Sequence, residues 1–273
     1  MNVKLSKYIF IFLIVFSYNS LKAQEESMNY LGFDDPERSL WLGSYMNFRI
    51  TDKFFWAGEF HYRRTEYNEI PYVGRMGQIY NRHGIKYVAS KNFSTTVGGV
   101  LRLNFSPEPG NTDFRDLILE PRIWHEYVFA IPFERFMVYH RMRFEHRWKK
   151  SNKQGASFSY MNRYRYKFYM KIPLNNKKLV PGTFYFSPDV ELIMQSGSSV
   201  PFEPMEDLRL YPNIGYIHSP RIGGSIGLTY TAGQKMDVGD FYYKQRWIIR
   251  LNAYISLDFR KFEQKVPEIN LND

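Results

Sequence analysis

EPRIWHEYVFAIPFERFMVYHRMRFEHRW, residues 120–148, decides how this chain folds, because it contains the same alternation twice. In the first half, apolar residues such as Ile123 and Phe129 alternate with polar residues such as Glu120 and Arg122. The second half, from Phe136 onward, has the same period of two, which is the period of a β-strand. The stretch therefore predicts a long hairpin with one apolar face and one charged face.

Opposite charges on the charged face predict a register for this hairpin. A four-residue turn at 132–135 sets three pairs of opposite charge directly across from each other: Glu126 with Arg141, Arg122 with Glu145, and Glu120 with Arg147. A turn two residues shorter would instead set Arg122 against Arg143, and like charges directly opposite destabilise a strand pair. We therefore expect the four-residue turn.

Composition narrows the class of protein. The chain has 273 residues, of which 18% are aromatic, including 22 Tyr and 23 Phe, more than a compact core needs. Its basic residues alternate with apolar ones along strands and do not form a run, which argues against a nucleic-acid-binding arm. With no cysteine, the chain can have neither a disulfide framework nor thiol chemistry.

The amino-terminal residues 1–23 have the pattern of a secretory signal peptide: basic residues, a short apolar run, and a small residue, Ala23, at the expected cleavage point. The alternative is a membrane anchor, but a spanning helix needs about 20 apolar residues and this run is about half that. Loss of the leader removes three lysines and no acid, which lowers the formal charge from +10 to +7. After it we expect a polar segment at 24–39 with a short first strand near 30–33, a barrel at 40–259, and a polar tail at 260–273.

Alternating segments of about ten residues recur along the chain. They predict strands at 40–50, 54–63, 79–88, 93–105, 117–131, 136–148, 158–172, 183–194, 208–217, 222–231 and 241–257. Short turns at 51–53, 89–92, 132–135 and 218–221, with a longer connection at 173–182, alternate with mostly longer loops at 64–77, 106–116, 149–155, 195–206 and 232–240. Short turns at one end and longer loops at the other are typical of outer-membrane barrels.

The barrel can close in two ways. A membrane barrel turns its apolar face to lipid, whereas a soluble barrel of lipocalin type turns it inward. The number of strands favours the membrane form, because side chains fill only barrels near eight strands. Aromatic residues toward strand ends are consistent with girdles at the lipid headgroups: Trp41, Tyr45, Phe54, Phe55, Trp56, Tyr160, Phe184, Phe186, Phe241, Tyr242 and Tyr243. We predict a single antiparallel up-and-down transmembrane β-barrel of about 12 strands (10–12), an even number that places both ends in the periplasm.

Several stretches also resemble a known family. These are LWLGSYMNF at 40–48, TDKFFWAGEFHYRR at 51–64, RIWHEYVF at 122–129, YHRMRFEHRW at 139–148 and the closing strand. Together they resemble the uncharacterised outer-membrane family DUF2490 over most of residues 40–259. The resemblance implies a single barrel in the outer membrane of a Gram-negative bacterium, and brings no catalytic residue with it.

For function, we expect a barrel interior lined by charge. The candidate lumen-lining residues are Glu120, Arg122, Glu126, Arg141, Arg143, Glu145, Arg147, Arg163, Arg165, Arg246 and Arg250. Two roles are open: a lumen closed by ion pairs, in a structural barrel, or a narrow pore that prefers anions. In either case the expected partners are outer-membrane lipid and, during insertion, the barrel-assembly machinery, with no nucleic acid and no identifiable soluble partner.

An enzyme belongs to a different class, and we do not expect one. A lipid-modifying hydrolase would need a serine next to one of the six histidines, but no spacing marks a nucleophile with its base. The acidic clusters at 34–37 and 203–207 are more typical of solvated loops than of calcium sites, so we expect no metal and no cofactor.

Overall fold

The computed structural model describes residues 29–105, 117–151, 153, 155–197, 200, 203–237 and 240–260. Twelve strands make up this part of the chain: β1 (Asn29–Phe33), β2 (Glu37–Arg49), β3 (Phe54–Tyr67), β4 (Ile70–Ser90), β5 (Phe93–Phe105), β6 (Leu117–Pro132), β7 (Met137–Lys149), β8 (Ser159–Pro173), β9 (Thr183–Ser196), β10 (Met205–Ile217), β11 (Ile222–Asp237) and β12 (Asp240–Asp258). Among these residues no helix has the length and hydropathy to cross a membrane. The signal-peptide prediction and most of the tail prediction lie outside the described residues.

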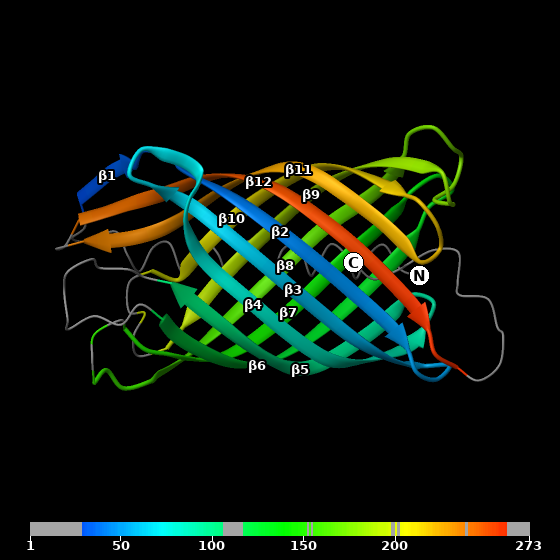
Figure 1. Ribbon diagram of the computed structural model, residues 1–273, viewed down its shortest axis with the longest axis horizontal. Coiled ribbons are helices and arrows are strands. Elements are labelled where there is room, and N and C mark those ends of the chain that lie inside the picture. The colour runs from blue at the N-terminus through cyan, green and yellow to red at the C-terminus, as the bar shows by residue number, and fades with distance from the viewer. Residues whose placement is uncertain are drawn as a thin grey trace, which may run out of the picture.

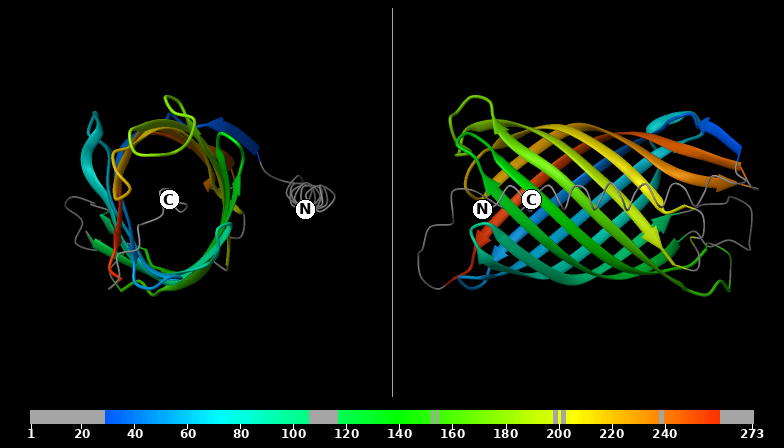
Figure 2. Two further views of the ribbon diagram at one scale, coloured as in Figure 1. Left: turned by 90° about the vertical axis from the view of Figure 1, so that its right-hand side faces the viewer. Right: turned by 180° about the vertical axis from the view of Figure 1, so that it is seen from behind.

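Eleven of the strands form a closed ring. From β2 to β12 each strand pairs antiparallel with the next, and β12 then pairs with β2 to complete the cylinder (Figures 1 and 2). This last pairing is parallel, from Arg246 opposite Glu37 to Asp258 opposite Arg49. An odd number of strands makes a parallel closure unavoidable, because the first and last strands of an odd meander run in the same direction.

The twelfth strand, β1, confirms the short strand expected near 30–33. It pairs in parallel with β12, with Asn29 opposite Asp240 and Phe33 opposite Tyr243, just ahead of the β2 pairing. β1 therefore pairs with the same strand as β2, at an earlier part of β12, and does not add a strand to the ring. The predicted total of about twelve strands is correct, but the expectation of an even ring with both ends on one side is not met: β2 begins at one end of the cylinder and β12 finishes at the other (Figure 1).

The two faces of the strands are those that the alternation predicts. Along β6, residues 118, 120, 122, 124, 126, 128 and 130 are buried, while Leu119, Ile123 and Phe129 are exposed. The buried set faces the interior of the ring and contains the charges. Four of the predicted girdle residues are exceptions: Trp41 and Tyr45 of β2, Phe55 of β3 and Tyr242 of β12 all have the inward parity of their strands. Trp41 is buried inside, and Tyr45 accepts a hydrogen bond there from Arg250, so proximity to a strand end was the wrong criterion for these residues.

The connections differ between the two ends. One end has the short turns after β2, β4, β6 and β10 and the 174–182 connection. The other end has the connections that were expected to be long, but two of them are largely strand. β3 and β4 continue past the ring to a tight turn at Asn68 and Glu69, which both have positive φ, and β11 extends to Asp237. At the short-turn end, a hydrogen bond from Arg260 to Asp258 raises the pKa of the Arg260 guanidinium above its ordinary value.

The predicted register of the β6–β7 hairpin is wrong by two residues. Arg122 lies opposite Arg147 and Glu126 opposite Arg143, and the turn occupies 133–136. A shift of two keeps every side chain on its face, so the division into apolar and charged walls is unaffected. Arg122 and Arg147 are therefore like charges directly opposite each other, which ordinarily destabilises a strand pair. They are tolerated here because Glu120 lies 2.7 Å from each of them.

An apolar cluster fills the interior at the short-turn end. Leu179 of the 174–182 connection is buried there with Tyr139 and Tyr169, whose rings stack at 4.5 Å, and with Tyr185. Tyr185 in turn covers Gly215, where a Cβ would overlap with its ring. The connection therefore places an apolar side chain among the inward-facing residues at this mouth of the cylinder.

Candidate functional site in the barrel interior

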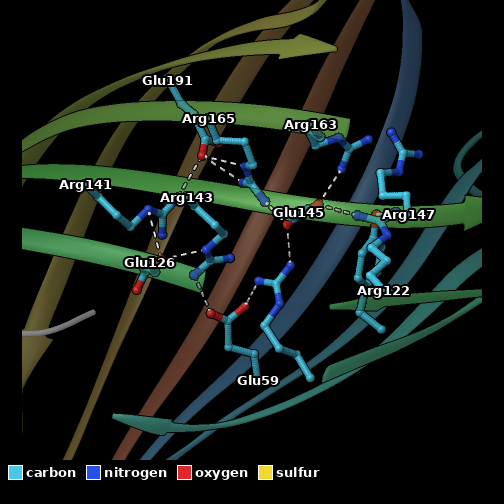
Figure 3. A network of polar contacts seen from close by, with 12 residues as sticks. Glu59, Arg122, Glu126, Arg141, Arg143, Glu145, Arg147, Arg163, Arg165 and Glu191 are labelled. Carbon is cyan, nitrogen blue, oxygen red and sulfur yellow. Dashed lines mark hydrogen bonds and ion pairs between the residues drawn. The ribbon is translucent and has the colours of Figure 1, made fainter. Parts of the chain in front are cut away.

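The interior between the two ends is filled by arginine and glutamate side chains from many strands. Inward positions that alternate along β6 and β7 also face inward positions of strands across the ring, so a long side chain reaches well beyond its sheet neighbours. Figure 3 shows these side chains converging from β3, β6, β7, β8 and β9. The contacts form a continuous network with glutamates as its shared acceptors.

Glu145 of β7 is the centre of this network. Its carboxylate, which is fully buried, lies 2.8 Å from Arg82 of β4, 2.6 Å from Arg122 of β6, and 3.3 Å and 3.1 Å from Arg163 and Arg165 of β8. One carboxylate thus connects four guanidinium groups from three other strands. Such charge-assisted bonds are shorter and stronger than neutral ones.

Two further glutamates continue the network around one wall. Glu59 of β3 pairs with Arg82 and accepts a 2.8 Å bond from Arg143 of β7. Arg143 also donates to Glu126 of β6 at 2.5 Å, and Arg141 lies 3.6 Å from the same carboxylate. The strand β3 is therefore tied to β7 across the interior, although the two are four places apart in the ring.

Glu191 of β9 is the equivalent acceptor on the other wall. It lies 2.7 Å from Arg141 and 2.7 Å from Arg165, and the Tyr211 hydroxyl donates to it at 2.5 Å. Beside it, Lys167 and Asp189 pair at 2.6 Å. Because Arg165 also binds Glu145, the two walls belong to one network (Figure 3).

Toward the long-connection end, Glu120 and Glu206 are the acceptors. Glu120 lies 2.9 Å from Arg102, 2.7 Å from Arg122 and 2.7 Å from Arg147. Glu206 lies 3.1 Å from Arg147 and also pairs with Arg163. Each of these carboxylates is shared by at least two arginines, as are Glu59, Glu126, Glu145 and Glu191.

The structure places the eleven candidate lumen-lining residues in three groups. Nine belong to the network just described. Arg246 lies nearer the long-connection mouth, 2.8 Å from Glu37, and Arg250 lies apart from the carboxylates, 5.0 Å from the Tyr211 ring. The three ion pairs expected in the leading hairpin all form, but as diagonal contacts in the shifted register.

The candidate set omitted five residues that carry the network's contacts: Glu59, Arg82, Arg102, Glu191 and Glu206. Glu59 and Glu191 have the charged parity of their strands, so alternation alone could have included them. Arg82 shares the buried face of β4 with Lys86. The two are four residues apart, so charge does not recur at every second residue and the alternation is harder to recognise. Glu206 lay in an expected loop, whereas it is the second residue of β10.

The electrostatic arrangement favours a closed interior. Removing one charge from water costs several kcal/mol, which is recovered only where the partners provide good geometry and further hydrogen bonds. Sharing each carboxylate among several arginines provides both. Two deeper cavities measure about 70 and 40 Å³, room for small groups of water molecules, and a third, of about 370 Å³, lies at the long-connection end.

The histidines have aromatic or acidic neighbours. His61 lies 3.4 Å from Glu59 inside the ring, and His83 and His218 lie against aromatic rings. The other three face outward: His125 stacks on Phe144, while Nδ1 of His140 and of His146 lies 2.8 Å from a tyrosine hydroxyl. These contacts explain how imidazoles are tolerated on an otherwise apolar wall.

Three of the six acidic residues considered as metal ligands are engaged by basic groups. Glu37 binds Arg246, Glu206 binds Arg163, and Asp207 lies 2.5 Å from Arg209. Within the described ranges no group of three or more His, Asp or Glu side chains could hold a metal ion. What the site can do chemically is bind charge and exclude solvent.

Fold and site together define a closed β-barrel whose interior is filled by an ion-paired network. The chain belongs to a family described as protein of unknown function (DUF2490), whose model matches residues 38–242. The resemblance found in the strand motifs is thereby confirmed. The comparisons with curated proteins and with solved structures found no match.

Proposed function

We propose that this protein is an outer-membrane β-barrel whose apolar wall faces lipid. One observation carries the proposal: large apolar side chains are exposed all around the ring while the charges are buried inside. Val97, Ile123 and Ile226, on β5, β6 and β11, are 58%, 52% and 57% exposed. Soluble monomers rarely expose a contiguous apolar patch larger than a few hundred Å², and here the apolar surface encircles the molecule.

The lengths of the strands support the same placement. A membrane-spanning strand needs about 9–11 residues when tilted, and the ring strands have 13 to 21. Closure of the ring also pairs every strand edge within it, as hydrocarbon requires. A lipocalin-like barrel would need the opposite assignment of the two faces.

Orientation follows from the connections. In outer-membrane barrels the short turns lie in the periplasm and the longer loops outside. By that rule the end of β12 and the 260–273 tail face the periplasm, and β2 begins at the outer end. The signal peptide at 1–23 directs secretion in this proposal, and outer-membrane lipid and the barrel-assembly machinery are the partners of a Gram-negative location.

For the interior, we infer a structural barrel whose lumen is closed by ion pairs. The network that centres on Glu145 supports this role, together with the small volume of the two deeper cavities. The excess of basic residues at the long-connection mouth favours the second candidate, a narrow pore that prefers anions. Planar-bilayer recordings distinguish them: a closed barrel gives no steps of conductance, whereas a pore gives steps whose reversal potential shifts toward that of the anion.

The membrane placement is tested by placing single thiols, because the chain has no cysteine. Ile123→Cys puts a thiol on the outward wall, and Glu134→Cys, in an exposed turn, is the matched control. With a fluorophore on each thiol and the protein refolded into vesicles, lipids brominated at mid-chain should quench the Ile123→Cys probe strongly and the control weakly. Equal quenching at both positions, or a folded protein that stays in solution without detergent, would refute the proposal.

A further inference from the structure

The cavity at the long-connection end is strongly basic. It has a volume of about 370 Å³, within the range of small-molecule sites, and is lined by nine lysine and arginine side chains but by only three carboxylates, Glu37, Glu120 and Glu206. This mouth of the barrel, which we call the basic vestibule, thus has three times as many basic as acidic side chains in its lining. The question is whether the carboxylates neutralise it.

The three carboxylates are already shared among other bases. Glu37 pairs with Arg246 at 2.8 Å and with Lys244 at 3.5 Å. Glu120 serves three arginines, and Glu206 serves two, as described above. Within the described part of the chain, four of the lining bases bond to neither a carboxylate nor a backbone carbonyl: Arg63, Arg75, Lys149 and Lys150. Arg64 also has no carboxylate partner, but it donates to the carbonyl oxygen of Val73. The vestibule therefore retains an excess of at least four positive charges.

Arg63 is held in position without being neutralised. Its guanidinium carbon lies 3.6 Å from the centre of the Trp41 ring and 4.4 Å from that of Tyr80. The neutral amide of Gln78 accepts one weak bond from it at 3.3 Å. Aromatic stacking fixes the plane of the guanidinium and leaves its charge uncompensated.

Unused donors gather around the same cavity. The Nε groups of Arg63, Arg75 and Arg102 are buried and make no hydrogen bond to any residue that the structure describes. The Nε groups of Arg82, Arg122 and Arg141, deeper in the interior, are in the same state, so unused arginine donors extend from the ion-paired middle to this cavity. No anionic oxygen atom of a described residue accepts a hydrogen bond from the Nε groups of Arg63, Arg75 and Arg102.

We propose that the basic vestibule binds a multivalent phosphate-bearing anion. A guanidinium fork matches the oxygen atoms of phosphate, and four uncompensated cations fit a polyanion better than a single carboxylate. The phosphate could belong to a soluble molecule or to a lipid headgroup, since the chemistry of recognition is the same. The inference goes beyond the proposed membrane role and does not depend on it, because the cavity lies inside the ring in either setting.

The test is a calorimetric titration of the full-length protein, folded in an uncharged detergent, with inorganic pyrophosphate. Arg63→Gln should weaken binding by about tenfold or more, because a hydrogen bond to a charged group contributes about 1.5–3 kcal/mol. Arg221→Gln removes the same charge from an exposed turn at the opposite end and should leave the affinity unchanged. If Arg63→Gln fails to fold, the double variant Lys149→Gln/Lys150→Gln replaces it, with the same loss expected.

A parallel arm uses short-chain phosphatidic acid in the micelles, with phosphatidylcholine as its control. Binding of pyrophosphate alone identifies a soluble source, and binding of phosphatidic acid alone identifies a lipid source, provided that the vestibule variants reduce it. No saturable binding of either probe would overturn the proposal. An equal loss in Arg221→Gln would also overturn it, because attraction to net charge would then be the whole effect. Neither result bears on the quenching experiment, so the two proposals can fail separately.

Discussion

At the scale of single residues, the interior has fewer carboxylates than basic side chains, so one carboxylate often contacts several arginines. Glu145 has no exposed surface and contacts four guanidinium groups, so its charge offsets part of the repulsion among all of them. Removing one partner of a buried ion pair is far more costly than the pair is worth, since it leaves uncompensated charge in a low dielectric. Because Glu145 is shared by four arginines, loss of its charge should cost more than loss of one partner in a simple pair.

Glu145→Gln is therefore expected to destabilise the barrel by about 3–5 kcal/mol, although it preserves the shape of the side chain. Urea unfolding in lipid vesicles, followed by tryptophan fluorescence, measures the change in the free energy of unfolding. Glu134→Gln, in an exposed turn, is the control and should change stability by less than about 0.5 kcal/mol. If the two variants unfold alike, the network does not stabilise the fold.

At the scale of elements, the 174–182 connection differs from the other connections at its end of the barrel. The others are short turns, whereas this one folds inward and buries Leu179 against Tyr139, Tyr169 and Tyr185. Asn175 secures its base by hydrogen bonds with Gly182 and Phe184. The connection thus adds an apolar side chain to the cluster at the short-turn mouth, while ion pairs fill the middle.

Leu179→Ala tests that packing. Truncation of a buried leucine costs about 2–5 kcal/mol, depending on how far the site collapses, and we expect a value in that range from the same urea experiment. Leu174→Ala in the same connection is the matched control, because Leu174 is 56% exposed. A loss of stability that is equally small in both variants would show that the connection does not pack in the mouth.

At the scale of the whole molecule, the odd ring sets the relation between the two ends of the chain. The parallel pairing of β12 with β2 places the beginning of β2 and the end of β12 at opposite mouths (Figure 1). A twelve-strand meander closed by an antiparallel pair would have placed them together. The pairing of β1 with β12 continues the same seam beyond the ring.

This seam can be tested by cross-linking. Ser44 and Ala253 are opposite each other in the β2–β12 register and have the outward parity, so Ser44→Cys/Ala253→Cys should be joined efficiently by a short thiol-specific reagent. Ser44→Cys/Val97→Cys, with the second thiol three strands away on β5, should not be. The joined chain is identified by its altered migration on a denaturing gel. A negative result for the first pair, with both thiols reactive, would rule out the parallel closure.

Much of the fold could be predicted because alternation is a local property. The eleven ring strands were each expected, with errors mainly at their ends: β4 begins nine residues before the predicted position because the β3–β4 hairpin extends past the ring. The candidate charges were found for the same reason. Glu206 was missed because β10 begins earlier than predicted, and Arg82 because charge is sparse along the buried face of β4. Spacing along one strand also does not tell which partners meet across the interior.

The sequence by itself determined which face of each strand is apolar and which is charged, because alternate side chains point to opposite walls and register shifts of two residues preserve that assignment. Only the tertiary structure decided the register of β6 and β7, the odd ring with its parallel seam, and the sharing of Glu145 by four arginines. Those features depend on distances between strands far apart in the chain. Such distances are fixed when the cylinder closes and brings all inward side chains into one volume.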